Sequence, residues 1–410
     1  MEENITKYHF FKGDRILWIA IIAISLFSIL PVYSASSNLV YIVNNGTTSG
    51  HLIKHIIFII AGLFLMRGMS IFKYEYIGKL SIIGLICSIV LLIVTMFMGQ
   101  TIEGASASRW ITIPGIGLSF QPSSIAYLML IIYLCWYLTK SVNRERLPIE
   151  NIIYVFGPIL LVFVLVAKDN GSTALMILMV SIAVLILGGL GWKYIVGFIS
   201  TAVLVSVVAI TVLLKTDVAK DTRIHTWASR IEAFTKSKDQ LSEEEKEVLK
   251  TKNYQVNQAK AAIVHGKYTG VGPGKSALKQ KLPQSASDFI FAIIIEEYGI
   301  VGTIGLLFLY SVIIFRIIII ANKMPAFFGT LLVLSLGVMF FLQLSVNIAV
   351  ALNLIPVTGQ PLPLISYGGT SMLVTYALLG IILNVSSRIQ IYDEEGFGRQ
   401  QSIEEINDIA

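Results

Sequence analysis

Long apolar runs are the feature that most constrains what this chain can fold into. About ten stretches have the roughly 20 residues that a helix needs to cross a bilayer. They lie near residues 16–34, 52–68, 77–98, 121–139, 150–167, 173–190, 192–214, 287–321, 326–352 and 366–387. Only 14% of the residues are charged, whereas a soluble domain has about 25%. The sequence therefore predicts an all-α polytopic membrane protein.

The charges predict how these spans are arranged. Basic residues gather at alternate connections, and the other short connections hold only Lys54, Arg109 and Lys168. Because short cytoplasmic loops are enriched in Lys and Arg, both termini are expected in the cytoplasm. The predicted units are transmembrane helices 1–7 in 1–214, a large extracytoplasmic loop in 215–286, helices 8–10 in 287–392, and a cytoplasmic tail without regular structure in 393–410.

Several function classes are not expected. Cys87 and Cys135 lie inside apolar runs and are typical of small core residues rather than a disulfide or metal pair. The histidines lack the spacing of a zinc enzyme, and no cleavable signal peptide follows Met1. No nucleic-acid partner is expected.

The richest stretch is 265–299, HGKYTGVGPGKSALKQKLPQSASDFIFAIIIEEYG. A loop of glycines and lysines leads into an apolar helix. The loop fails the spacing of an ATP-binding P-loop. Two interpretations remain, an ordinary flexible loop or a turn whose backbone N–H groups approach an anion.

Three carboxylates of this stretch are candidates for chemistry. Asp288 follows Ser285 in an S-x-x-D pattern, which is typical of a capping box at a helix start, and it is equally suited to be a catalytic carboxylate. Glu296 and Glu297 fall within the predicted span, where buried acids need a partner. A structural ion pair and a catalytic role both remain open for them.

Two further segments indicate a site. Arg109 and Trp110 lie on an external loop, where Arg suits phosphate and Trp suits the membrane interface. Residues 356–371, PVTGQPLPLISYGGTS, are uncharged and broken by Pro and Gly. Irregular backbone at membrane depth is tolerated only inside protein or along a cavity.

Four motifs carry a family resemblance: RWITIPGIGLSFQPSS, KDNGSTALMI, GVGPGKSALKQKLPQSASDFIFAIIIEEYGIVG and GQPLPLISYGGTS. In order and spacing they resemble the SEDS family (shape, elongation, division, sporulation), and the resemblance covers nearly the whole chain. Its septal branch is the most similar, with the elongation branch as the alternative. The resemblance implies a peptidoglycan glycosyltransferase that polymerises lipid II outside the bacterial cytoplasmic membrane, at the division septum. It also implies a class B penicillin-binding protein and other division proteins as partners.

The resemblance further implies roles for individual residues. The essential aspartate of the family corresponds to Asp288, which would be the general base. No cofactor is certain, although a divalent cation, Mg²⁺ or Mn²⁺, is compatible with pyrophosphate chemistry. The expected substrate-binding residues are Arg109, Trp110, Lys275, Ser276, Glu296, Glu297, Ser366, Tyr367, Gly368 and Gly369.

Two departures from the family pattern stand out. Ser124 and Tyr127 occupy positions where the family usually has an acid and a base, so that pair is replaced by neutral groups. The segment Asp169 to Thr173 carries one extra residue near its turn. Two competing functions also remain: a flippase that moves lipid-linked precursors, or a non-catalytic scaffold.

Overall fold

The computed structural model describes residues 11–41, 47–98, 110–112, 119–140, 149–202, 254–277, 279 and 285–409. Helices and strands follow one another in this order: α1 (Arg15–Tyr41), α2 (Thr48–Ile71), α3 (Tyr74–Met98), β1 (Ile111–Thr112), β2 (Ser119–Phe120), α4 (Pro122–Lys140), α5 (Ile149–Ala167), α6 (Gly171–Leu187), α10 (Tyr254–Gly266), α11 (Ile290–Lys323), α12 (Phe327–Ala351) and α13 (Gly369–Ile409). Residues 192–202 are also helical. The short strands β1 and β2 pair antiparallel.

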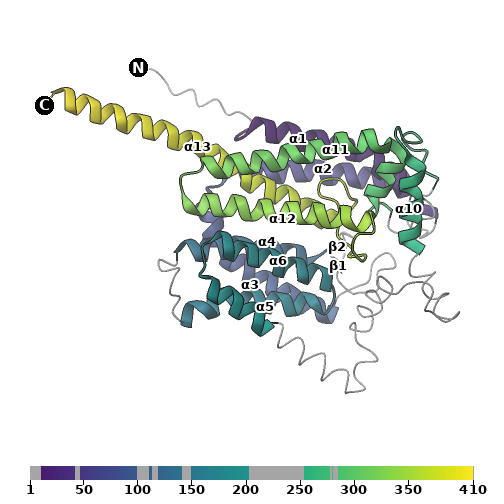
Figure 1. Cartoon of the computed structure of the whole chain (residues 1–410), viewed down its shortest axis with the longest axis horizontal. Coiled ribbons are helices and arrows are strands. Elements are labelled where there is room, and N and C mark those ends of the chain that lie inside the picture. The colour runs from purple at the N-terminus through teal and green to yellow at the C-terminus, as the bar shows by residue number, and fades with distance from the viewer. Residues whose placement is uncertain are drawn as a thin grey trace.

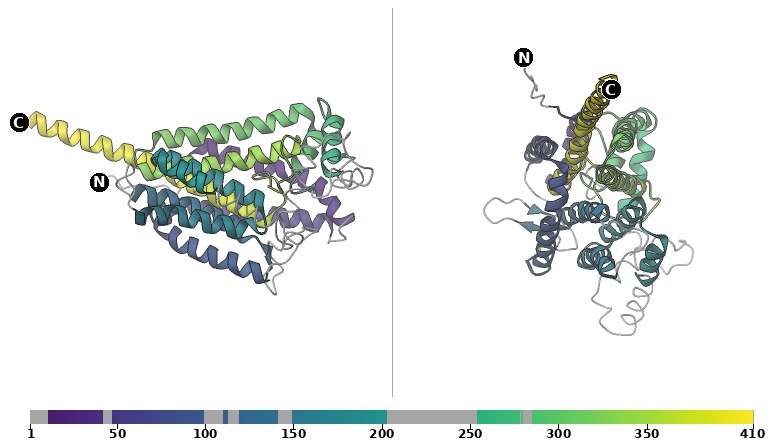
Figure 2. Two further views of the ribbon diagram at one scale, coloured as in Figure 1. Left: turned by 60° about the horizontal axis from the view of Figure 1, so that its bottom comes forward. Right: turned by 90° about the vertical axis from the view of Figure 1, so that its left-hand side faces the viewer.

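The long helices form one bundle and run roughly side by side (Figures 1 and 2). In one half, α13 packs on α2, while α11 packs on α1 and α12. In the other half, α3 packs on α4 and α5 on α6. Helix α12 also contacts α4 and α6 and thereby joins the two halves. A continuous apolar core with Phe340, Leu332 and Ile381 fully buried fills the space between the helices.

Within the described residues, seven helices are long and apolar enough to cross a membrane. Two shorter apolar helices, Asn151–Ala167 and Gly171–Leu187, add to them. The predicted all-α polytopic membrane fold is therefore confirmed. The predicted seventh span at 192–214 lies partly outside the described residues, as does most of the predicted loop at 215–286.

One boundary prediction is wrong. Residues 393–409 were expected to lack regular structure, yet α13 continues through them to Ile409. Glu and Gln, which are frequent in this segment, are good helix formers, and a helix already nucleated in the membrane extends without a new nucleation cost. The acidic composition of this segment therefore does not end the helix.

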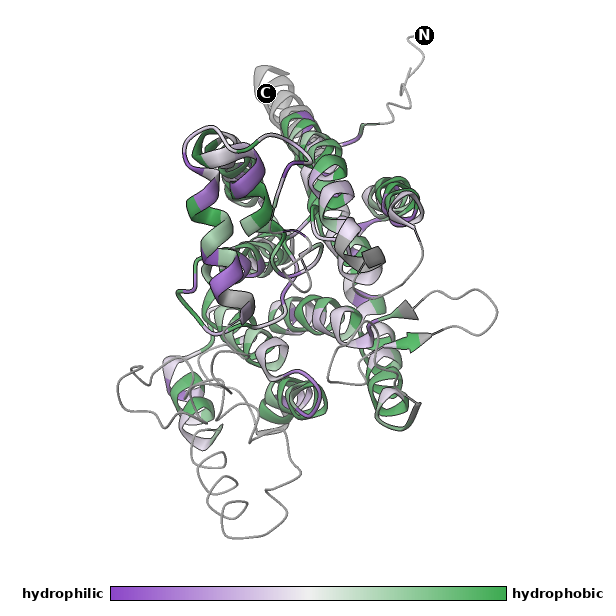
Figure 3. Ribbon diagram, turned by 90° about the vertical axis from the view of Figure 1, so that its right-hand side faces the viewer, coloured by the Kyte–Doolittle hydropathy of each residue, from purple (hydrophilic) through white to green (hydrophobic). Residues whose placement is uncertain are grey.

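The two ends of the bundle carry different elements and contacts. Helix α1 begins and α13 ends at the same end in Figure 1, whereas α10 and the β1–β2 pair lie at the opposite end, here called the α10 end. At the terminal end, Arg316 forms an ion pair with Asp14. Figure 3 looks onto the α10 end and shows hydrophobic residues along most of the bundle helices, with hydrophilic residues on the segments nearer the viewer.

Candidate functional site

Asp288 lies in a turn that precedes α11. Residues 285–289 form this turn, and α11 begins at Ile290 with Phe289 as its N-cap. Phe289 makes no side-chain cap hydrogen bond. The predicted capping box is therefore wrong, because Asp288 lies outside the helix rather than in its first turn. Its side chain is half-buried.

The turn is held by hydrogen bonds from two other segments. The Ser366 hydroxyl donates to the Ser287 carbonyl at 2.5 Å, and the Tyr367 N–H donates to the Ala286 carbonyl at 2.8 Å. From α12, the Asn347 side-chain amide donates to the carbonyl of Asp288 itself at 3.0 Å. These contacts use main-chain carbonyls of the turn and do not involve the carboxylate of Asp288.

Glu296 and Glu297 are buried beneath the Gly-rich loop, with exposed fractions of 0% and 1%. The Glu296 carboxylate accepts hydrogen bonds from the Ser276 hydroxyl, from Ala277 N–H at 3.1 Å and from His265 Nδ1 at 3.0 Å. The Glu297 carboxylate accepts from the Ser34 hydroxyl of α1 and from Ser276 N–H at 3.3 Å. Among the described residues, serines and loop amides donate most of the hydrogen bonds to the two acids. His265 is the one basic side chain within hydrogen-bond distance of either acid. The glutamate pair therefore anchors the loop.

The loop is also inserted into the hydrogen-bond ladder of α11. Gly299 interrupts the helix with φ 66° and ψ −169°. Beyond it, Ile300 N–H donates to the Lys267 carbonyl and Val301 N–H to the Tyr268 carbonyl, both at 3.1 Å. These donors would otherwise bond the carbonyls of Glu296 and Glu297. Val271 N–H at 2.9 Å and Gly272 N–H at 3.0 Å occupy those carbonyls instead.

This exchange overturns one interpretation of the loop. The N–H groups of residues 270, 271, 272, 275, 276 and 277 all donate within the protein, so they do not form the anion cradle that the glycines suggested. The side chain of Lys275 is exposed and remains a cationic group of the loop. Ser276 is buried, with an exposed fraction of 4%, and it bridges the two glutamates.

The segment 356–368 has no regular structure, as predicted, and it is buried within the protein. Leu362, Leu364 and Ile365 are at most 1% exposed. The Tyr367 hydroxyl lies 3.1 Å from His51 Nδ1 of α2. Gly369 begins α13 beside Phe58, where a Cβ atom would lie 2.6 Å from the ring. The motif from Ser366 to Gly369 therefore connects the Asp288 turn to α2 and α13.

Behind the turn lies a small pocket with many polar lining residues. It is lined by Gln121, Ser124, Tyr127, Thr173, Met339, Gln343, Gly359, Gln360, Pro361, Ser371 and Val374. Ser124 and Tyr127, which replace the acid and base of the family pattern, both line this pocket. Gln360 Nε2 donates to the Thr173 hydroxyl at 2.7 Å. Asn347 donates to the Gln360 carbonyl at 2.7 Å, so the same amide contacts the pocket segment and the Asp288 turn.

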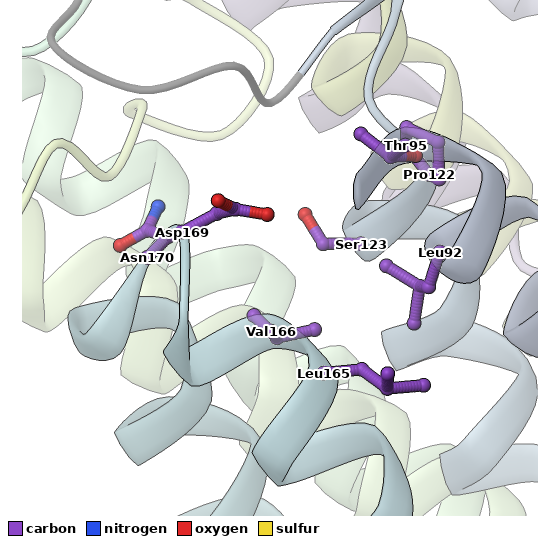
Figure 4. A pocket seen from close by; sticks show the side chains of 8 residues that line it. All are labelled: Leu92, Thr95, Pro122, Ser123, Leu165, Val166, Asp169 and Asn170. Atoms are coloured by element: carbon purple, nitrogen blue, oxygen red, sulfur yellow. The ribbon is translucent and has the colours of Figure 1, made fainter. Parts of the chain in front are cut away.

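A second pocket lies between α3, α4, α5 and α6. Figure 4 shows the Asp169 carboxylate pointing across it toward the Ser123 hydroxyl. The neighbouring Asn170 side chain accepts from Thr173 N–H at 3.2 Å and caps α6. The extra residue in this segment is accommodated by that capped turn.

The structure brings most of the predicted site residues to the α10 end. Ser366 and Tyr367 of the motif 366–369 hydrogen-bond to the Asp288 turn, whereas Ser276, which follows Lys275, hydrogen-bonds to the glutamate pair. Both groups contact neighbouring residues of α1, through Ser285 with Ala35 and Glu297 with Ser34. Trp110 is half-buried beside β1, and β2 contacts α13. Arg109 lies outside the described residues. Sequence reasoning missed Ser34, Asn347 and Gln360. A polar side chain inside an apolar span, such as Asn347, was the available signal.

The described residues offer few metal ligands near the site. Within the described part of the chain, no three His, Cys, Asp or Glu side chains come together as metal ligands. The described residues thus do not fit a protein-built metal site, and no chemical step is assigned to a metal. The divalent cation stays a prediction.

Comparisons with known proteins agree with this arrangement. A family model described as cell cycle protein, covering FtsW, RodA and SpoVE, matches residues 14–390. The probable peptidoglycan glycosyltransferase FtsW of Enterococcus hirae is 31% identical over 397 residues, which cover 92% of this chain and 94% of that one. The peptidoglycan glycosyltransferase MrdB of Escherichia coli K12 is 29% identical over 393 residues, which cover 94% and 97%.

Solved structures share the fold. A chain of a peptidoglycan synthase complex that coordinates polymerization and crosslinking has a TM-score of 0.66 and 24% identity, covering 92% of this chain and 98% of its own. The rod shape determining protein RodA of Thermus thermophilus has a TM-score of 0.62 and 24% identity, covering 92% and 97%. With the family model matched along nearly its whole length, the chain belongs to the FtsW/RodA/SpoVE family, which is the SEDS family that its motifs predict.

Proposed function

We propose that this protein is a peptidoglycan glycosyltransferase that polymerises lipid II at the outer face of the bacterial cytoplasmic membrane. The observation that carries the proposal is the Asp288 turn. Its carboxylate is half-buried at the α10 end, and neighbouring segments fix its main chain. A carboxylate that is rigidly presented at a membrane surface is suited to proton abstraction from a substrate that stays anchored in lipid.

The chemistry needs one base and one anion-stabilising region. A sugar hydroxyl of one substrate attacks the anomeric carbon of another, and the lipid pyrophosphate leaves. Asp288 takes the hydroxyl proton, a contribution of about 10²–10⁴-fold for a positioned general base. Pyrophosphate leaves as a stable anion and needs no second carboxylic acid of the kind that glycosidases use. Lys275 and Arg109 supply positive charge to the leaving group.

The remaining candidate residues act around this centre. Trp110, Tyr367 and the glycines 368 and 369 shape the region where the substrate sugars lie. Ser276, Glu296 and Glu297 act on substrate through the loop that they anchor, and this places Lys275 relative to Asp288. A Mg²⁺ or Mn²⁺ ion remains compatible with the pyrophosphate, and dependence of the rate on added cation would test it.

The relatives support a role in cell-wall synthesis and include both branches of the family. The FtsW protein of Enterococcus hirae and the MrdB protein of Escherichia coli K12 are 31% and 29% identical to this chain, respectively. We propose the septal role, at the division septum with other division proteins, and the FtsW relatives support it. The elongation role is the alternative. Depletion followed by microscopy separates the two, since filaments indicate the septal role and rounded cells the elongation role.

The partner prediction is a class B penicillin-binding protein, which supplies the crosslinking activity. The similar solved complex coordinates polymerization with crosslinking. We expect the protein to co-purify with its class B partner and to polymerise labelled lipid II faster in the complex than alone. Gel analysis of glycan strands measures the product. Absence of glycan from the complex, under conditions in which an established polymerase works, would contradict the proposed activity.

The orientation gives a separate prediction. Tyr268 is 76% exposed in the loop that precedes α11, whereas Lys323 ends that helix. With Cys87 and Cys135 replaced, an impermeant thiol reagent applied to intact cells should label Tyr268→Cys and leave Lys323→Cys unlabelled. Both variants should react after the cells are permeabilised. The opposite pattern in intact cells would place the Asp288 turn in the cytoplasm and would exclude an extracellular site.

A further inference from the structure

We propose that Asn347 is a positioning residue that fixes the Asp288 turn for catalysis. The proposal rests on the proposed glycosyltransferase function for its catalytic consequence and on geometry for its structural one. Asn347 lies in α12 and is fully buried. Its side chain carries the sole polar group of α12 that donates to the turn among the described residues.

The contacts of Asn347 distinguish it from the other groups that hold the turn. Ser366 and Tyr367 donate to the carbonyls of Ser287 and Ala286, which precede the catalytic candidate. Asn347 donates to the carbonyl of Asp288 itself at 3.0 Å. A shift of this peptide plane moves the Cα and hence the carboxylate of Asp288. Misplacement of a catalytic group by about 1 Å can cost about 10²-fold in rate.

The second hydrogen bond of the amide extends this effect. Asn347 also donates to the Gln360 carbonyl at 2.7 Å, and Gln360 binds Thr173 in α6 at 2.7 Å. Gln360 lines the polar pocket behind the turn. One amide therefore ties the Asp288 turn to the wall of that pocket. Both of its N–H donors are used in this way, and a hydrophobic residue of similar size cannot replace them.

The chain provides a matched control at the other end of the bundle. Asn384 in α13 is also fully buried. Its amide donates to two main-chain carbonyls, those of Met69 at 2.7 Å and of Phe72. In both asparagines the side-chain oxygen has no hydrogen-bond partner among the described residues. Substitution of either asparagine removes two hydrogen bonds to main-chain carbonyls. Of the two, only Asn347 contacts the Asp288 turn.

The test compares Asn347→Leu with Asn384→Leu. A second pair, Asn347→Asp and Asn384→Asp, leaves the side-chain volume nearly unchanged. Hydrogen exchange is measured first on the full-length protein in complex with its partner. We expect the Tyr367 amide, which donates to Ala286, to exchange about 10-fold faster in the Asn347 variants than in the wild type. The Asn384 variants should leave its exchange unchanged. Equal exchange in the wild type and the Asn347 variants would overturn the proposal, whatever the enzymatic result.

Polymerisation of lipid II is then measured per folded protein. The Asn347 variants should lower kcat by about 10²-fold, the cost of a misplaced catalytic group, with little change in KM. The Asn384 variants should keep the wild-type kcat even where their thermal stability falls equally. Equal loss of kcat in both members of a pair would reduce Asn347 to a structural residue. A wild-type protein that makes no glycan would contradict the proposed function, while the exchange result would still decide whether Asn347 fixes the turn.

Discussion

Asp288→Asn should abolish most glycan synthesis, lowering polymerisation by at least about 10²-fold, without unfolding the protein. An amide has nearly the size of the carboxylate but cannot accept the proton of the attacking hydroxyl. The turn should keep its geometry, because its contacts with Asn347, Ser366 and Tyr367 use main-chain carbonyls that the substitution leaves in place. Labelled lipid II, gel analysis of glycan strands and thermal unfolding of the same preparations measure both expectations.

The control for this prediction is Asp14→Asn at the opposite end of the bundle. Asp14 forms an ion pair with Arg316 and caps the start of α1 through Leu17 N–H at 2.8 Å. Its loss should lower thermal stability and leave the rate per folded protein unchanged. If Asp288→Asn polymerises as fast as the wild type, Asp288 is not the base. A flippase would make no glycan in either form, so a productive wild-type protein also excludes transport as the sole function.

How well each part of the fold could be predicted depends on the physical strength of the sequence pattern behind it. Apolar runs of about 20 residues specify membrane helices almost without tertiary information, and the helices α1 to α4 and α11 to α13 confirm that prediction. Burial of the irregular segment 356–368 followed from the cost of unsatisfied backbone in lipid. The helical tail was missed because acidic composition says little about a helix that is already nucleated.

The details of the site needed long-range contacts that local patterns do not contain. The S-x-x-D pattern at Ser285 indicated a cap, but the turn forms main-chain hydrogen bonds with segments about 60 to 80 residues away in sequence. The glutamate pair indicated a cationic partner, and His265 contacts Glu296, but the other donors to the pair are Ser34, Ser276 and loop amides. In both cases the polar groups were identified correctly, and most of their partners were not.

Gly299→Ala should have the largest effect on stability among glycine substitutions in α11. Gly299 has φ 66° and ψ −169°, a region that is essentially restricted to glycine and costs other residues about 1–3 kcal/mol. A Cβ atom there would also lie 2.4 Å from both Gly270 N and the Tyr268 carbonyl oxygen. Both contacts are with backbone, which cannot move aside as a flexible side chain can. We expect a loss of about 3 kcal/mol or more in the free energy of unfolding, measured by denaturation in detergent.

Gly305→Ala in the same helix is the matched control. No atom lies within 4 Å of the Cβ position that it would create, and alanine is the better helix former by about 1 kcal/mol. This variant should be as stable as the wild type or slightly more stable, with unchanged polymerisation. Gly299→Ala should also lower polymerisation by about 10²-fold, because displacement of the loop moves Lys275 and Ser276 away from their positions.

The glycine that faces Gly299 allows the physical cause to be tested. A Cβ atom at Gly270 would lie 2.2 Å from the Glu297 carbonyl oxygen and 2.6 Å from Gly299 N, so Gly270→Ala should separate the same two backbones. Once one substitution has displaced the loop, the second has less contact left to disrupt. The double variant should therefore be destabilised by clearly less than the sum of the single effects. Additive losses would mean that each glycine is needed only for its own backbone conformation, and that insertion of the loop into α11 does not couple them.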